Sequence, residues 1–133
     1  MKLKTAELIG QALDYAVAVC EGGTFRMHTM RSYEPVTVPV MHWPNGYWVE
    51  LCDLAYSSDW SLSGEIIERE EIELLKWARE GWEAKATNYS FLNTPQETDV
   101  FAEGHGPTPL VAAMRCYVAS KLGDEVEIPD ELL

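Results

Sequence analysis

Apolar residues recur at helical spacing near the start of the chain. One face of the predicted helix collects four of them, which are Leu8, Ala12, Tyr15 and Val19. Gly22 and Gly23 follow this stripe, and glycine accepts the left-handed backbone in which many helices end. Thr5 precedes the stripe and is a typical capping residue. The pattern therefore predicts a helix over about 5–21 with Thr5 as its N-cap.

A second helical period lies near the end of the chain, after the sequence Gly-Pro-Thr-Pro at 106–109. Thr108 is a typical N-cap, and Pro109 suits the first helical position because its missing N–H would be unpaired there anyway. The predicted buried face comprises Leu110, Ala113, Met114, Tyr117 and Val118. With Gly123 as the stop, this pattern predicts a helix over 108–122.

After the first helix, the pattern changes to the alternation that is typical of strands. Valines at 36, 38 and 40 alternate with Thr37 and Pro39, and Pro39 favours an edge strand because it lacks an N–H. A second aromatic and β-branched run spans 47–52. Between the two runs lies Asn45-Gly46, the strongest short signal of a hairpin turn. We expect a hairpin near 36–52 with its tip at these two residues.

The middle of the chain has a weaker pattern. Residues 55–64 are rich in Ser, Asp and Gly and predict a loop, followed by a short buried strand at Ile66-Ile67. Residues 72–77 fit either a helix or a strand, and residues 82–86 alternate as in a strand. The polar segment 88–103 predicts a mobile loop, and the acidic tail after Gly123 predicts a short edge strand. Together the elements indicate one compact α+β domain over 1–133, with two main helices and a small, mainly antiparallel sheet.

The charge excludes two classes of function. The 133 residues include 10 basic and 22 acidic ones, a net charge of −12, divided as −3 over residues 1–64 and −9 over 65–133. Binding to nucleic-acid polymers and to anionic membranes both depend on clustered cations. The sequence has no signal peptide and no run of roughly 20 apolar residues that would span a bilayer. We therefore expect a cytoplasmic protein, with reduced and buried thiols at its three widely spaced cysteines, Cys20, Cys52 and Cys116.

Three stretches of the sequence together resemble the NinX-like family, small proteins of unknown function from tailed phages and prophages. They run from Lys4 to Gly22, from Tyr56 to Ile72 and from Gly106 to Val126. Within the second stretch, Ser63 and Glu65 stand where the family pattern has glycine and proline. The resemblance implies a phage accessory protein made inside the host bacterium, and it implies no mechanism.

The start of the last helix is one candidate binding site. Its first N–H groups and the positive end of the helix dipole favour an anion near Thr108. Gly106 would allow a close approach of the backbone to a ligand, and Arg115 would add a cation. The alternative interpretation is that the sequence 106–109 is simply a well-formed helix start.

The predicted loop at 56–64 is the second candidate. Small hydroxyl residues between two aromatic residues suit a polar ligand on which a ring stacks. The residues of this candidate site are Tyr56, Ser57, Ser58, Asp59, Trp60 and Gly64, with Arg69 as a further cation. The alternative is a surface loop whose aromatic rings pack on the core.

Other side-chain patterns favour neither catalysis nor a metal. His28, His42 and His105 lack the spacing of metal ligands, and no phosphate-binding loop or nucleophile motif occurs. The glutamates between 65 and 73 fit a solvated face, although a pair of them, with Glu70 as a candidate, would suit a hydrolase. We therefore expect no catalytic residues, no metal and no cofactor.

Two hypotheses of function follow. The first is a non-enzymatic counter-defence protein in the host cytoplasm that binds and sequesters a small anionic, nucleotide-type signal molecule. The second is an acidic interaction module that mimics nucleic acid toward a basic host protein, since the second half of the chain carries −9. Neither requires polymeric nucleic acid or a membrane as the partner, and association of the chain with itself is compatible with both.

Overall fold

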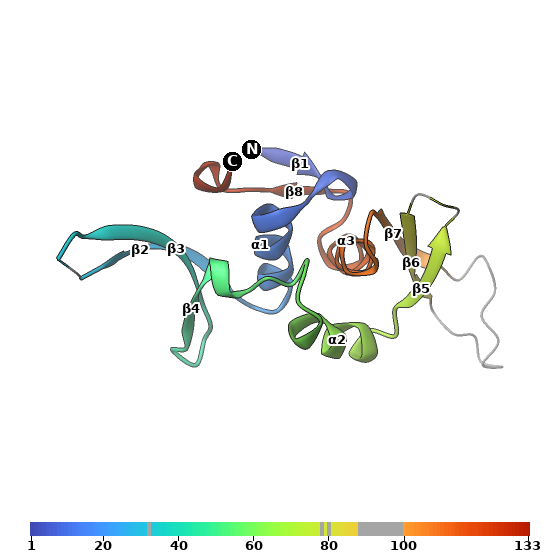
Figure 1. The fold of residues 1–133 in the computed structure, drawn as a ribbon, viewed down its shortest axis with the longest axis horizontal. Coiled ribbons are helices and arrows are strands. Elements are labelled where there is room, and N and C mark those ends of the chain that lie inside the picture. The colour runs from blue at the N-terminus through green and yellow to red at the C-terminus, as the bar shows by residue number, and fades with distance from the viewer. Residues whose placement is uncertain (32, 78, 80, 88–99) are drawn as a thin grey trace.

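The computed structural model describes residues 1–31, 33–77, 79, 81–87 and 100–133, which form a mixed α+β fold (Figure 1). The α-helices of this part are α1 (Gly10–Cys20), α2 (Trp60–Arg69) and α3 (Pro109–Leu122). Its strands are β1 (Lys2–Lys4), β2 (Thr24–Met30), β3 (Val36–His42), β4 (Trp48–Glu50), β5 (Glu73–Trp77), β6 (Gly81–Thr87), β7 (Val100–Gly106) and β8 (Glu125–Glu127). They form three small antiparallel sheets in this part, ordered β1-β8, β2-β3-β4 and β5-β6-β7. The predicted α+β class is confirmed, with the sheet divided into three.

Helix α3 lies at the centre of the fold, between α1 and the sheet β5-β6-β7 (Figure 1). A helix that is apolar on all sides needs cover on all sides. The buried residues of α3 are Leu110, Val111, Ala112, Ala113, Met114, Cys116, Tyr117 and Val118. Thr108 caps the helix by accepting a hydrogen bond from Val111 N–H at 3.2 Å, and Gly123 follows its last turn with a φ of 85°. Both ends of this helix therefore match the prediction.

Helix α1 begins later than predicted. It starts at Gly10, because Thr5–Glu7 form a separate 3-10 helix. Thr5 is not the N-cap of α1, since its hydroxyl instead donates to the carbonyl oxygen of Gly123 at 2.6 Å. This contact ties the start of the chain to the end of α3. The end of α1 matches the prediction, since the helix stops at Cys20 and Gly22 has a φ of 96°.

The predicted hairpin is present, with its turn at Asn45-Gly46, where Gly46 has a φ of 88°. Strand β2 pairs with the other side of β3, so β3 is the central strand of its sheet. The prediction of an edge strand from Pro39 is therefore wrong. The proline is accommodated because β4 pairs only with Val40–His42 and so does not reach Pro39.

Helix α2 replaces the loop end and short strand predicted between 60 and 67. The carboxylate of Asp59 caps it by accepting a hydrogen bond from Ser61 N–H at 2.9 Å. Ser63 is buried within the helix, and its hydroxyl donates to the carbonyl oxygen of Tyr56 at 2.5 Å. The polar residues that suggested a loop thus cap and anchor a helix, which buries Ile66 in the core.

The strands of the second half of the chain can be compared with the predictions one by one. Residues 73–77 form strand β5, which settles the open choice, and β6 confirms the strand predicted over 82–86. Residues 100–106 are strand β7, not part of a loop, whereas residues 88–99 lie outside the described residues. The predicted tail strand is present as β8, paired with β1 beside the two chain ends (Figure 1).

Candidate functional site

The start of α3, predicted as an anion site, is exposed at Pro107 and Thr108 and buried from Leu110 onward. Leu110 and Val111 are buried, and the N–H of Val111 already donates to the Thr108 hydroxyl. A Cβ at Gly106 would lie 2.7 Å from Cγ1 of Val111. The absence of a side chain at Gly106 therefore lets β7 approach α3. This geometry fits the interpretation of the segment as a well-formed helix start.

The predicted site at 56–64 holds α1 and α2 together through its polar groups. The N–H of Ser57 donates to the carboxylate of Asp14 in α1 at 2.8 Å, and burial raises the pKa of Asp14, an effect that this hydrogen bond partly opposes. Tyr56 is buried, while Ser58 is exposed and Trp60 keeps 52% of its surface exposed. The interpretation of a ring packed on the core thus holds for Tyr56 but not for Trp60.

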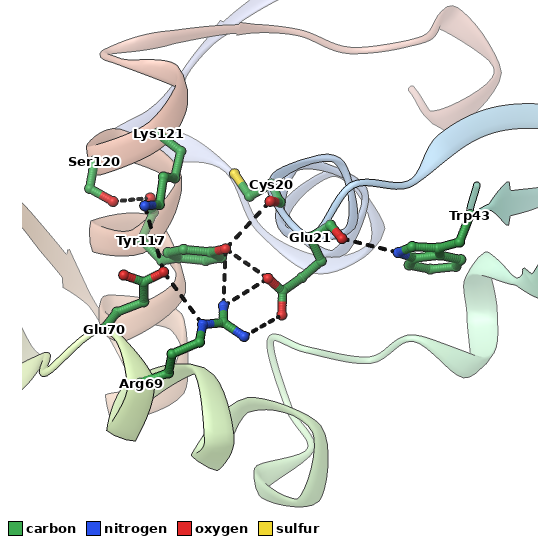
Figure 2. A network of polar contacts seen from close by, with 8 residues as sticks. All are labelled: Cys20, Glu21, Trp43, Arg69, Glu70, Tyr117, Ser120 and Lys121. Carbon is green, nitrogen blue, oxygen red and sulfur yellow. Dashed lines mark hydrogen bonds and ion pairs between the residues drawn. The ribbon is translucent and has the colours of Figure 1, made fainter. Parts of the chain in front are cut away.

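Arg69 belongs to a cluster of polar side chains that joins all three helices (Figure 2). Its guanidinium donates to both carboxylate oxygens of Glu21, at 3.2 and 2.8 Å, and the Tyr117 hydroxyl donates to the same carboxylate at 2.7 Å. The guanidinium carbon lies 5.8 Å from the centre of the Tyr117 ring. Burial raises the pKa of Tyr56 to about 12, and the charges of Glu21 and Asp14 add to the effect. The contacts of Arg69 with Glu21 and Tyr117 make it a link between the helices.

Glu70, the residue named for a hydrolase, extends this cluster toward α3. Its carboxylate lies 3.5 Å from Nε of Arg69 and 3.6 Å from Nζ of Lys121 (Figure 2). Lys121 also lies 6.0 Å from the centre of the Tyr117 ring. Two cations therefore pair with Glu70, which links α2 to α3.

Arg115 lies at a different place, in a cleft of about 290 Å³. The cleft is formed by the N-terminal segment, β7, α3 and the segment that begins β8. Its lining comprises Lys4, Thr5, Ala6, Glu103, Gly104, His105, Arg115, Ala119, Asp124 and Glu125. Of the ten predicted site residues, Arg115 lines this cleft, and no residue of 56–64 does. The structure therefore divides the predicted site between two places.

The guanidinium of Arg115 is held in place by two backbone oxygens. Nε donates to the carbonyl oxygen of Leu8 at 2.8 Å, and Nη1 donates to that of His105 at 2.7 Å. A guanidinium has five N–H groups, so these two bonds leave further donors for a ligand. Burial lowers the pKa of Arg115, but an arginine side chain stays protonated in proteins. The cleft thus contains an oriented, permanent cation.

Charges of both signs line the cleft. Lys4 and Arg115 share the lining with three acidic residues, Glu103, Asp124 and Glu125. A ligand with several negative charges would meet repulsion from these three carboxylates. The balance suits a ligand that carries one anionic group together with hydrogen-bond donors.

Sequence reasoning missed most of this cleft, because its walls come from both ends of the chain. The available signal for Glu103 and His105, which lie on the same face of β7, was their alternation with the small residues Ala102, Gly104 and Gly106. That face also brings Glu103 and His105 near Glu83 of β6, with one potential ligand atom from each within 4.8 Å of the others. Nζ of Lys85 lies 3.4 Å from Glu83 and competes with a metal ion for it. A similar group is formed by Glu50, Cys52 and Asp53.

The cysteines differ from one another in burial. Cys20 and Cys116 are shielded from solvent, and burial raises the pKa of both thiols to about 12. Cys52 is exposed, so the prediction of buried thiols is wrong at this position. It lies in a short 3-10 helix, Leu51–Asp53, in which Leu51 provides the buried side chain. All three thiols are free.

These features define a small acidic α+β protein with a cleft of mixed charge at the meeting point of its two chain ends. The chain belongs to the family described as Bacteriophage P22, NinX, whose model matches residues 4–121. The family resemblance seen in three stretches of sequence is therefore confirmed. A search of curated proteins found no match. No helix in the described parts of the chain is long and apolar enough to cross a membrane.

Proposed function

We propose that this phage protein is a non-enzymatic counter-defence protein that binds and sequesters a small nucleotide-type ligand in the host cytoplasm. The observation that carries the proposal is the cleft beside Arg115, which the oriented guanidinium and Lys4 line together with three acidic residues. A nucleoside monophosphate matches this arrangement chemically. Its phosphate suits Arg115 and Lys4, and the N–H groups of its base suit the carboxylates.

The dimensions of the cleft favour one nucleotide unit. Ligand pockets commonly measure roughly 300–1,000 Å³, and this cleft, at about 290 Å³, is at the small end of that range. His105 lines the cleft and its carbonyl oxygen accepts a hydrogen bond from Arg115, whereas its imidazole lies beside Glu83 of β6, with Nε2 at 3.9 Å from the carboxylate. We therefore expect mononucleotides to bind more tightly than their triphosphates, whose extra charges meet Glu103, Asp124 and Glu125.

Isothermal titration with a panel of linear and cyclic nucleotides tests this proposal. At a protein concentration of about 50 µM, micromolar affinities give measurable heat. We expect a nucleoside monophosphate to bind and Lys4→Ala to weaken binding several-fold. Lys2→Ala is the matched control, because Lys2 lies on the same strand but not in the cleft. The absence of heat with every nucleotide would overturn the proposal.

Arg115→Ala removes the central cation, and we expect a loss of binding of about tenfold or more. This variant also loses two hydrogen bonds to the backbone, so its thermal unfolding must be compared with that of the unmodified protein. A folded Arg115→Ala protein that still binds at full affinity would exclude the cleft as the site.

An acidic interaction module is the second proposed function, and the distribution of charge favours it. Residues 65–133 carry −9, and α2 presents Glu65 and Glu68 to solvent. Such a surface would suit a basic host protein by mimicking the charge of nucleic acid. Capture from host lysate should then recover a stoichiometric basic partner that is released at high salt. Recovery of no such partner argues against mimicry.

A further inference from the structure

Strands β2 and β3 form a two-stranded arm, residues 24–42, that projects away from α1 and the core (Figure 1). In its outer half, residues 27–29, 36 and 37 are exposed, while Met30, Val38 and Pro39 are half-buried. Met27 keeps 41% of its surface exposed, and Val36 keeps 53%. A hairpin of two strands is only marginally stable in water without further packing. The arm is therefore a segment that gains stability when another surface covers it.

The outer edge of β2 has no partner strand, along its whole length, in the part of the chain that the structure describes. Among the strands that the structure describes, β2 pairs with β3 alone. An open edge is a template for a further strand, and proteins commonly protect such edges with proline or a bulge. β2 contains no proline and pairs with β3 in continuous register over its seven residues, whereas β3 contains Pro39. The edge of β2 is therefore the one suited to pairing.

The charge of the arm indicates which partner can approach it. Residues 24–42 contain Arg26, Arg31 and Glu34, a net charge of +1, so the rest of the −12 chain carries −13. Two copies of this chain repel each other strongly if their bodies meet. They repel least if they meet through their arms, which are nearly neutral and project away from the rest of each chain (Figure 1).

We propose that the chain forms a two-fold symmetric dimer in which β2 of one copy pairs antiparallel with β2 of the other. This interface is separate from the cleft beside Arg115 and does not depend on the proposed ligand. Antiparallel pairing about a two-fold axis places the same strand of both copies side by side, which is the usual form of an isologous dimer. The two hairpins then form one continuous sheet.

The axis passes through Met27, the central residue of β2. In this register all seven residues of each strand are paired, and Met27 faces its copy. Arg26 then faces His28 of the other copy, so the two arginines are not directly opposite each other. The exposed apolar surface of Met27 is covered, and this is the stabilisation that the arm lacks in a single chain.

Light scattering after size exclusion tests the dimer. At about 100 µM, where an association of micromolar affinity is well populated, we expect twice the chain mass of 15.0 kDa. Met27→Glu places like charges opposite each other and should weaken the dimer roughly tenfold or more. Trp60→Glu is the matched control, because it makes the same change of charge at an exposed apolar residue of α2 and should leave the dimer intact.

Disulfide trapping tests the register. In a Cys52→Ser background, which removes the exposed thiol, oxidised Met27→Cys protein should form a covalent dimer, since cross-strand neighbours are close enough for a disulfide. Ser61→Cys, on the exposed face of α2, serves as the control for random cross-linking. A mass of one chain at every concentration overturns the proposal. A dimer that persists in Met27→Glu, or that cross-links equally through Ser61→Cys, does so as well.

Discussion

Gly104 is tightly packed and Gly64 is not. Alanine substitutions at the two positions therefore separate the cost of steric overlap from the gain that comes from a less flexible backbone. A Cβ at Gly104 would lie 2.2 Å from the carbonyl oxygen of Ala112 and 2.5 Å from the backbone nitrogen of Cys116. Since backbone atoms of α3 cannot give way, Gly104→Ala should destabilise the protein by about 3 kcal/mol. Urea unfolding measures this loss.

Gly64→Ala is the matched control, because a Cβ there has no atom within 4 Å and the residue lies inside α2. Alanine favours a helix over glycine, so we expect a gain of about 0.5–1 kcal/mol. A similar loss of stability in both variants would contradict the close approach of β7 to α3.

Asp14 should make the stability of the protein fall as pH rises. Burial raises its pKa, so the folded chain holds the proton more tightly than the unfolded chain does. Ionisation above the unfolded pKa therefore costs stability, and the cost persists at neutral pH. Asp14→Asn removes the charge and keeps an acceptor for Ser57 N–H. The free energy of unfolding of this variant minus that of the unmodified protein should increase as pH rises from about 3 to 7, as measured by urea unfolding.

Asp59 should change the pH dependence of stability in the direction opposite to Asp14. Hydrogen bonds from the hydroxyl and N–H of Ser61 lower the pKa of Asp59. Its contribution to stability is present above the unfolded pKa and is lost as pH falls through the folded one. Asp59→Asn should therefore lose stability relative to the unmodified protein over the same rise in pH. If both variants respond in the same direction, the two environments have been misassigned.

At the scale of elements, the cap of α3 has an effect that can be isolated. Thr108 satisfies the N–H of Val111, which is buried. Thr108→Ala should cost about 1 kcal/mol of stability, and Thr108→Ser should retain most of it because serine offers the same acceptor. Chemical denaturation of both variants measures the difference. Equal stability of the alanine and serine variants would show that the cap contributes nothing.

The sequence pattern predicted those elements whose ends are marked by capping or turn residues within the element's own segment. Thr108 and Gly123 define α3, and Asn45-Gly46 defines the hairpin, without reference to the rest of the chain. Strand β7 escaped prediction because its inward positions are Ala102 and Gly104, which are small enough for α3 to approach but leave no apolar alternation. Thr5 looked like a helix cap, but its hydroxyl binds a residue far along the chain.

At the scale of the whole molecule, the candidate site could not be predicted as one place. Local patterns identified Arg115 and Arg69 as cations, but α3 and α2 carry them to different surroundings. Arg115 lines a cleft whose other walls come from Lys4 and Glu125, near opposite ends of the chain. The pairing of β1 with β8 brings those ends together, and such distant pairing has no signature in local spacing. The net charge of −12 for the whole chain likewise gave no sign of the nearly neutral arm.

The charge distribution predicts how salt affects self-association, and the direction distinguishes two modes of assembly. If β2 pairs with β2, the acidic bodies repel each other at a distance, and added salt screens this repulsion. Since the screening length falls from about 30 Å at 0.01 M to about 8 Å at 0.15 M, the dimer should become tighter over that range. If Arg26 and Arg31 instead bound carboxylates on the body of a second copy, salt would weaken the dimer. Sedimentation equilibrium across this range of KCl measures the dissociation constant, and a dimer that weakens with salt would exclude pairing through β2.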